Sequence, residues 1–179
     1  MRVLSVLLLL ALIGVSFAGC GDGQTKSASA LMEKLVFELK TVPTYRLYAK
    51  ADGKNFSKED FSYLYTGSYA SGQEIDGVED YCLLLSVRPT VFEIHIIQAV
   101  SASGVRSLVK LLSKRASLLR RYLDAGKSSE DGGFGQESAE PVILVYGQTV
   151  VLVATDRNEE IRSLLDRVFR RKAEVYTVT

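Results

Sequence analysis

Residues 141–169 read PVILVYGQTVVLVATDRNEEIRSLLDRVF, and the first half of this stretch predicts a β-hairpin. Two runs of aliphatic and β-branched residues, Pro141–Tyr146 and Thr149–Ala154, are typical of strands. The dipeptide Gly147-Gln148 lies between them. A two-residue connection with glycine in its first position favours a type II′ turn, because that position needs a positive φ angle.

The second half of the stretch predicts a helix directly after the hairpin. Asp156 is suited to cap its N-terminus, and Glu159, three residues later, completes the pattern of a capping box. We expect this helix to continue to about Lys172.

An upstream segment shows the same order of strand, strand and helix. Tyr81–Val87 and Thr90–Ala99 predict two strands, with Arg88-Pro89 as the turn between them. A second pair of strands followed by a helix favours two equivalent ββα units in one domain.

The upstream helix is predicted to be long and amphipathic. Ser101 or Ser103 caps it, it reaches about Ala125, and Gly126 is expected as the residue that ends it. Its apolar stripe recurs at helical spacing and consists of Val105, Leu108, Val109, Leu112, Ala116, Leu119 and Leu123.

Two further helices are predicted before the first strand pair. Ala30–Thr41 has apolar residues at helical spacing. Ser57 with Asp60 three residues later indicates the capped start of a shorter helix, which runs to Tyr65 and ends at Gly67.

These elements predict an α+β fold with a four-stranded, mainly antiparallel sheet built from two ββα units. All four strands are apolar on both faces, so both faces should be covered. We expect the two long helices on one face and the N-terminal helices on at least part of the other, where a partner is the alternative cover. The single domain should span 30–179 and contain a mobile, glycine- and serine-rich loop at 127–140.

The first residues have the pattern of a signal peptide. Val3–Ala18 carries no charge and follows Arg2, but the run is short for a membrane span, which needs roughly 20 residues. We therefore interpret 1–19 as a signal peptide, and the small polar residues of 20–29 as a flexible tether.

The end of this leader resembles the lipobox of bacterial lipoproteins. Phe17-Ala18-Gly19-Cys20 contains an apolar residue, two small residues and a cysteine, with phenylalanine where leucine is usual. The resemblance implies diacylglyceryl attachment to the Cys20 thiol and cleavage before it. Ordinary secretion with cleavage after Ala18 and an uncleaved anchor are the alternatives.

Composition narrows the classes of function. The 179 residues include no tryptophan and one histidine, which argues against histidine-rich metal sites, and we predict no metal or cofactor. The 22 basic residues include Arg2, so the chain from Cys20 onward has as many basic as acidic residues and is not a typical nucleic-acid binder. Cys82 is the only other cysteine and is predicted to be a buried apolar residue.

His95 is the residue with the most catalytic potential. Glu93 shares its side of the predicted strand and could orient the imidazole, but a nucleophile such as Ser86 or Ser101 would still be needed within about 3 Å. A cell-envelope hydrolase that uses His95 is therefore the alternative function. The competing interpretation, which we favour, is a structural His–Glu pair, and no catalytic residue is assigned.

A basic stripe is predicted opposite the apolar face of the long upstream helix. It consists of Arg106, Lys110, Lys114 and Arg121. Such a stripe is usually a solvated face, but beside a membrane it could contact anionic lipid or an anionic wall polymer.

The order of these features resembles a known family. The lipobox, DGVEDYCLLLSV entering a first strand, FEIHIIQAVS before a long helix, and residues 142–169 are similar to a family of small, mostly Gram-positive bacterial lipoproteins. The likeness covers Leu31–Phe169 and implies a domain of unknown function without established catalytic residues. We expect a lipid-anchored, non-enzymatic binding or accessory module on the outer face of the plasma membrane, with an envelope protein or wall polymer as partner.

Overall fold

The computed structural model describes residues 26–50, 57–66, 77–87, 91–127 and 140–177. Several predicted features lie outside these residues: the signal peptide (1–19) with Cys20, most of the tether, Gly67, Arg88-Pro89 and all but the ends of the loop at 127–140. The fold begins slightly earlier than predicted. Helix α2 starts at Ala28, and the Ser27 hydroxyl accepts a hydrogen bond from the Ala30 N–H at 3.2 Å, so the last residues expected in the tether belong to the domain.

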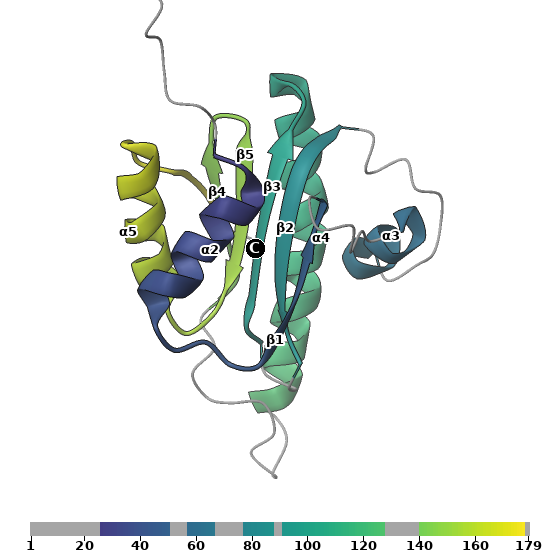
Figure 1. Ribbon diagram of the computed structural model, residues 1–179. Helices are drawn as coiled ribbons and strands as arrows, with labels where there is room; N and C mark the ends of the chain where they lie inside the picture. Colours follow the sequence, from purple (N-terminus) through teal and green to yellow (C-terminus); the bar gives the residue numbers. More distant parts are fainter. Residues whose placement is uncertain (1–25, 51–56, 67–76, 88–90, 128–139, 178–179) are drawn as a thin grey trace, which may run out of the picture.

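The described residues form an α+β fold with an open, antiparallel sheet of six strands, in the order β1-β2-β3-β5-β4-β6 (Figure 1). The elements are, in chain order, α2 (Ala28–Leu39), β1 (Tyr45–Ala49), α3 (Lys58–Thr66), β2 (Val78–Ser86), β3 (Glu93–Ala99), α4 (Ala102–Lys127), β4 (Val142–Tyr146), β5 (Thr149–Ala154), α5 (Asn158–Phe169) and β6 (Glu174–Thr177).

The prediction of a four-stranded sheet is therefore wrong, because it missed the two edge strands. The four predicted strands form the centre of the sheet, whereas β1 and β6 lie at its two edges. These edge strands have only 5 and 4 residues, and most of their side chains are not buried. They lack the continuous apolar run by which the central strands can be recognised, because an edge strand has a neighbour on one side only.

The hairpin of β4 and β5 confirms the predicted turn. Tyr146 pairs with Thr149, and Gly147 has a φ angle of 65°. Gln148 is not among the residues with positive φ, which distinguishes this turn from type I′ and matches type II′.

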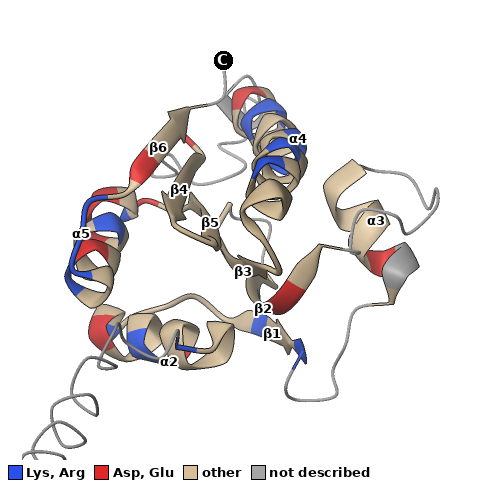
Figure 2. Cartoon of the chain, turned by 90° about the horizontal axis from the view of Figure 1, so that it is seen from above, with Lys and Arg blue, Asp and Glu red and all other residues tan. Residues whose placement is uncertain are grey.

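The two long helices do not share a face of the sheet, contrary to the prediction. Figure 2 shows α4 on one side of the sheet, together with α3, and α5 on the other, together with α2. The pairing explains this arrangement. Helix α4 joins the parallel strands β3 and β4, and α5 joins the parallel strands β5 and β6; both connections step in the same direction across the sheet.

Since β3 and β5 point in opposite directions, two such connections of the same hand must pass over opposite faces. The right hand is strongly preferred for connections between parallel strands. The face that α5 covers thus depends on β6, a strand that the sequence pattern did not reveal.

Three helix ends also differ from the prediction. Helix α5 begins after Arg157 with no side-chain cap, so Asp156 and Glu159 form no capping box. Instead the Asn158 carboxamide oxygen accepts a hydrogen bond from the Thr155 N–H at 2.9 Å, and the helix starts at Asn158, one residue later than expected. The same helix ends at Phe169, and α4 continues through Gly126 rather than ending before it.

The predicted starts of α3 and α4 agree with the structure, whereas α2 starts two residues before the predicted Ala30. The Asp60 N–H donates to the Ser57 hydroxyl at 3.0 Å, and the Ser57 N–H donates to the Asp60 carboxylate at 3.4 Å. These two bonds form the predicted capping box of α3. Ser101 caps α4 through a 3.3 Å bond from the Gly104 N–H.

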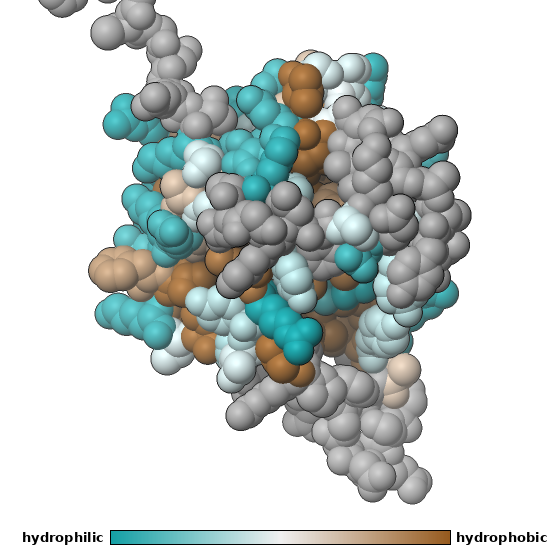
Figure 3. All heavy atoms as spheres, turned by 45° about the vertical axis from the view of Figure 1, so that its right-hand side comes forward, coloured by the Kyte–Doolittle hydropathy of each residue, from teal (hydrophilic) through white to brown (hydrophobic). Residues whose placement is uncertain are grey.

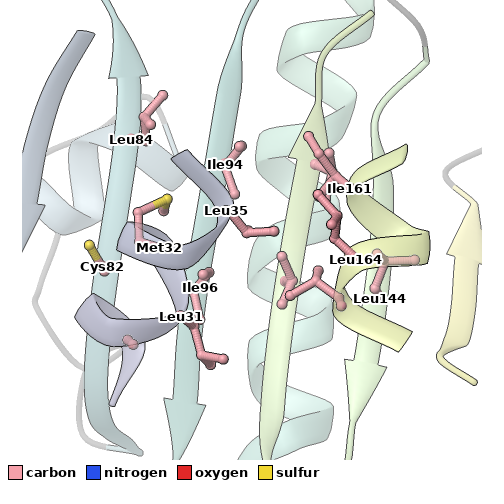
Figure 4. Close-up of a cluster of buried hydrophobic side chains, with 14 of the residues drawn as sticks. Leu31, Met32, Leu35, Cys82, Leu84, Ile94, Ile96, Leu144, Ile161 and Leu164 are labelled. Carbon is pink, nitrogen blue, oxygen red and sulfur yellow. The ribbon is translucent and has the colours of Figure 1, made fainter. Parts of the chain in front are cut away.

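Each face of the sheet has its own core. On the first face, α2 and α5 pack over an entirely apolar cluster (Figure 4) that includes Leu31, Met32, Leu35, Cys82, Leu84, Ile94, Ile96, Leu144, Ile161 and Leu164. On the second face, α3 and α4 cover Phe61, Tyr65, Leu83, Ile97, Leu112, Ala116, Leu119 and Leu152, among others. We call these the α2/α5 face and the α3/α4 face. Cys82 is fully buried in the first of them, as predicted, and forms no disulfide.

Candidate functional site

A buried network of polar side chains lies on the α3/α4 face of the sheet. Strand β3 contributes Glu93 and His95, α3 contributes Tyr65, and α4 contributes Arg115. Tyr65 and His95 are completely buried, and the side chains of Glu93 and Arg115 are 11% and 15% exposed. The four side chains join three elements, and the network spans from Tyr65 to Arg115 in the sequence.

The hydrogen bonds of His95 determine where its proton lies. The ring atom Nε2 is 3.1 Å from a Glu93 carboxylate oxygen, and Nδ1 is 2.7 Å from the Tyr65 hydroxyl. An ionised carboxylate can only accept, so Nε2–H donates to Glu93. Nδ1 of the neutral ring then accepts the proton of the Tyr65 hydroxyl, and both ring nitrogens have a partner.

Arg115 completes the network from the side of α4. Its Nε atom donates to Glu93 Oε2 at 3.0 Å, and its Nη2 atom donates to Glu93 Oε1. This bidentate geometry is the strong form of an arginine–carboxylate pair. The remaining Nη1 donates at 3.3 Å to the carbonyl oxygen of Leu64, so the guanidinium also holds the end of α3.

The surroundings set the charge of each group. Burial alone would raise the pKa of Glu93, but the hydrogen bond from His95 and the bonds and charge of Arg115 together outweigh it and lower the pKa to about 2. Burial lowers the pKa of His95 more than the neighbouring Glu93 raises it. Burial and the charge of Glu93 raise the pKa of Tyr65. Near neutral pH the network therefore holds one carboxylate, one guanidinium, a neutral imidazole and a neutral phenol.

The predicted Glu93–His95 pair thus exists, but neither candidate nucleophile joins it. Ser86 belongs to the alternating set of β2 residues that faces α2, on the opposite side of the sheet from His95. The Ser101 hydroxyl caps α4 beyond the end of β3 and lies 2.9 Å from the Ser103 hydroxyl. As arranged, His95 has no ring nitrogen left to activate either serine.

Tyr65 and Arg115 are the members of the network that no sequence pattern above brought together with His95. A signal for Arg115 exists. It lies between Leu112 and Leu119 in the row Leu108, Leu112, Arg115, Leu119, where helical spacing places it among the buried side chains. A charged residue at such a position indicates a buried ion pair, because an unpaired buried charge is costly.

The basic stripe of α4 lies on the opposite side of the same helix. Arg106, Lys110, Lys114 and Arg121 are all exposed, as their spacing predicts. Their exposure establishes a charged outer face on α4.

Among the described residues, no group of three or more histidine, cysteine, aspartate or glutamate side chains is placed to hold a metal ion. No described helix combines the length and apolar character needed to cross a membrane.

Comparison of the chain with protein-family models, curated proteins and solved structures finds no match.

Proposed function

We propose that the protein is a lipid-anchored extracytoplasmic lipoprotein whose domain acts as a non-enzymatic binding or accessory module on the outer face of a bacterial plasma membrane. The observation that carries the proposal is Phe17-Ala18-Gly19-Cys20 directly after the uncharged run Val3–Ala18. The two acyl chains of a diacylglyceryl group suffice for stable anchoring, whereas one chain is marginal. The likeness to the Gram-positive lipoprotein family remains part of this proposal.

The contrast between the two cysteines supports the anchor. Cys82 is fully buried in β2 under α2, where it packs as a small apolar residue. Cys20 lies eight residues before Ala28, the first residue of α2, so a lipid attached there is outside the described fold. This contrast favours Cys20 as the thiol that accepts the lipid.

The buried network supports a non-enzymatic role over a hydrolase. His95 is completely buried and bonded at both ring nitrogens, and the charge of Glu93 is matched by Arg115. These are the features of side chains that hold α3 and α4 against the sheet. A hydrolase that uses His95 would need α3 to withdraw Tyr65 and a nucleophile to take its place.

Metabolic labelling with a radioactive fatty acid tests the anchor. In a bacterium that processes lipoproteins, we expect the wild-type protein to incorporate the label and to sediment with membranes. Cys20→Ala should lose the label and either leave the membrane fraction or remain uncleaved, because it lacks the thiol that accepts the lipid.

Cys82→Ala is the matched control, because it removes the other cysteine. It should retain full labelling, since the buried thiol is not the acceptor. Equal labelling of wild type and Cys20→Ala would contradict the proposed anchor.

A further inference from the structure

The chain enters the domain at one end of the sheet. The Gln98 carboxamide donates to the carbonyl oxygen of Lys26 at 2.7 Å, and Gln98 lies near the end of β3. The first N–H of α2, that of Ala28, donates to the Asp80 carboxylate near the start of β2 at 2.8 Å. These two bonds hold the entry point beside the last residues of β3.

Other segments meet at the same end. The Ala99 N–H donates to the Gln148 carbonyl in the β4–β5 turn at 2.8 Å. The Arg171 guanidinium lies so close to Gly147 that a Cβ atom there would be 2.6 Å from its Nη2. Helix α4 begins three residues after Ala99. Figure 1 shows the start of α2, the β4–β5 turn, the start of α4 and the end of α5 together at the top.

This end carries exposed basic side chains and an exposed apolar residue. We define the tether-end surface as Lys26, Val100, Arg106, Arg171 and Lys172. The four basic residues are exposed, and Val100, at the tip between β3 and α4, is 60% exposed. Brown atoms at the top of Figure 3 mark apolar side chains that reach the surface at this end, among hydrophilic ones.

Four described acidic residues lie near the surface, and two of them are held by hydrogen bonds within the fold. Asp80 accepts hydrogen bonds from Ala28 and from the Tyr81 N–H, and Asp166 accepts from Tyr146 and pairs with Lys172 at 3.3 Å. The first turn of α4 contains no acidic residue. Glu79 and Glu174 are the exposed acidic residues described beside this surface.

The tether-end surface is also hollowed. A cleft of about 460 Å³ lies between the start of α4 and the β4–β5 turn. Ala102, Val105, Gly147, Arg171, Lys172 and Glu174 are among the residues that line it. Two basic side chains at an open recess can approach the phosphates of a lipid headgroup more closely than they could from a flat surface.

The length of the tether limits the distance to the membrane. Fully extended, the chain from Cys20 to Lys26 spans at most about 21 Å, since each residue adds roughly 3.5 Å. If Cys20 carries the lipid, Lys26 stays within that distance of the headgroups.

We infer that the tether-end surface rests on a bilayer containing anionic lipid, so that the domain stands end-on, with its strands pointing toward the membrane. This inference rests on the proposed lipid anchor.

The basic stripe predicts the competing orientation. Arg106 and Arg121 are about 22 Å apart along α4, at 1.5 Å per residue, so the stripe runs away from the tether end. The bilayer cannot contact all of the stripe unless the domain lies on its side.

Site-directed quenching distinguishes the two orientations in the full lipid-anchored protein. We would label Val100→Cys and, separately, Arg121→Cys with an environment-sensitive fluorophore. Cys82 is buried and Cys20 carries the lipid, so the new thiol is the reactive one. The labelled proteins are placed in vesicles of phosphatidylglycerol and phosphatidylcholine that contain a headgroup-spin-labelled lipid.

We expect the spin label to quench the probe at Val100→Cys at least threefold more than the probe at Arg121→Cys. Adding Arg171→Gln and Lys172→Gln should reduce the Val100→Cys quenching at least twofold. The matched pair Lys110→Gln and Lys114→Gln should leave it unchanged. Because exposed charges are screened by salt, the quenching should also decrease at high ionic strength.

Stronger quenching at Arg121→Cys, or equally weak quenching at both sites in membrane-bound protein, would overturn the end-on contact while leaving the anchor intact. Protein recovered without attached lipid would instead refute the proposed function, and the end-on contact with it. The two failures are therefore distinguishable.

Discussion

The two faces of the central sheet are built in different ways. On the α2/α5 face, side chains from both helices and five strands form a hydrophobic cluster, in which the Tyr146 hydroxyl donates to Asp166. On the α3/α4 face, apolar packing surrounds a buried ion pair, an imidazole and a phenol hydroxyl that bond in series. The same strands serve both faces, since β3 presents Ile94 and Ile96 to one and Glu93 and His95 to the other.

This difference indicates that the faces contribute differently to the fold. Apolar contacts stabilise α2 and α5 without strict geometry, because dispersion and the hydrophobic effect are not directional. The network on the other face requires Tyr65, His95, Glu93 and Arg115 to be present together. We therefore expect the polar network to fix one position of α3 and α4 on the sheet. Loss of one of its partners should lower the free energy of unfolding strongly.

The largest expected effect comes from breaking the ion pair. Arg115→Met should lower the free energy of unfolding by about 3–5 kcal/mol, because it leaves the Glu93 carboxylate buried without its positive partner. Denaturant unfolding at pH 7 measures the change.

The second substitution, Glu93→Gln in the Arg115→Met background, should recover at least half of that loss. A neutral carboxamide can still accept from His95 Nε2 but leaves no buried charge. If the double variant is as unstable as Arg115→Met, the loss comes from packing rather than from the unpaired carboxylate.

Acid should destabilise the packing on the α3/α4 face more than the packing on the α2/α5 face. The pKa of Glu93 is about 2 in the folded protein, below its ordinary 4.5, so the unfolded state takes up the proton first as the pH falls. The stabilisation is complete above about pH 4.5 and is lost as the pH falls toward 2, with a total of about 3 kcal/mol. The lowered pKa of His95 acts in the same direction, starting below its ordinary 6.5.

Unfolding curves between pH 7 and 2 test this expectation. Glu93→Gln should flatten the dependence relative to wild type. Leu35→Ala, on the apolar face, should lower stability by a similar amount at every pH, because a cavity does not titrate. Parallel curves for wild type and Glu93→Gln would refute the role given to this carboxylate.

Removing a single tyrosine hydroxyl on each face compares how much one hydrogen bond contributes to stability there. Tyr65→Phe should cost about 1–3 kcal/mol, because it leaves Nδ1 of the completely buried His95 without a donor. Tyr146→Phe removes a 2.8 Å bond to Asp166 on the α2/α5 side, but Asp166 retains the Ala173 N–H and Lys172. We expect a cost of at most about 1 kcal/mol there. Equal costs for the two variants would show that the polar network adds nothing beyond an ordinary hydrogen bond.

The smallest effect is expected on the outer side of α4. Replacing Arg106, Lys110, Lys114 or Arg121 with glutamine should change the free energy of unfolding by less than about 0.5 kcal/mol each, because these side chains are exposed. Thermal unfolding of the four single variants beside Arg115→Met provides the measurement. A loss above 1 kcal/mol in any of them would place that residue in the fold rather than on a solvated face.

Much of the central fold was predictable because its signals are local. β-Branched and aliphatic runs predicted the four central strands, and a glycine in the first position of a two-residue connection predicted the type II′ turn. Ser57 with Asp60 predicted a capping box that the structure contains. Glu93 and His95 were predictable as a pair, since alternate residues of a strand point to the same face.

Other features could be decided only by contacts between distant parts of the chain. β1 and β6 are strands because a neighbouring strand offers unpaired backbone groups, and short exposed segments carry no apolar signal of that pairing. The second edge strand then determines which face α5 covers. Thr155 and Asn158 replace the expected cap of α5, since bonding within the folded turn prevails over a statistical preference.

The sequence by itself determined that this chain has an uncharged leader ending at a cysteine, four apolar strands and two long amphipathic helices, because each of these depends on residues close together in the chain. Only the tertiary structure decided that Arg115 and Tyr65 meet Glu93 and His95. Buried charges and hydroxyls bond to whichever groups lie within hydrogen-bond distance in the folded core. Tyr65 and Arg115 come within that distance of His95 and Glu93 only when α3 and α4 lie on the sheet.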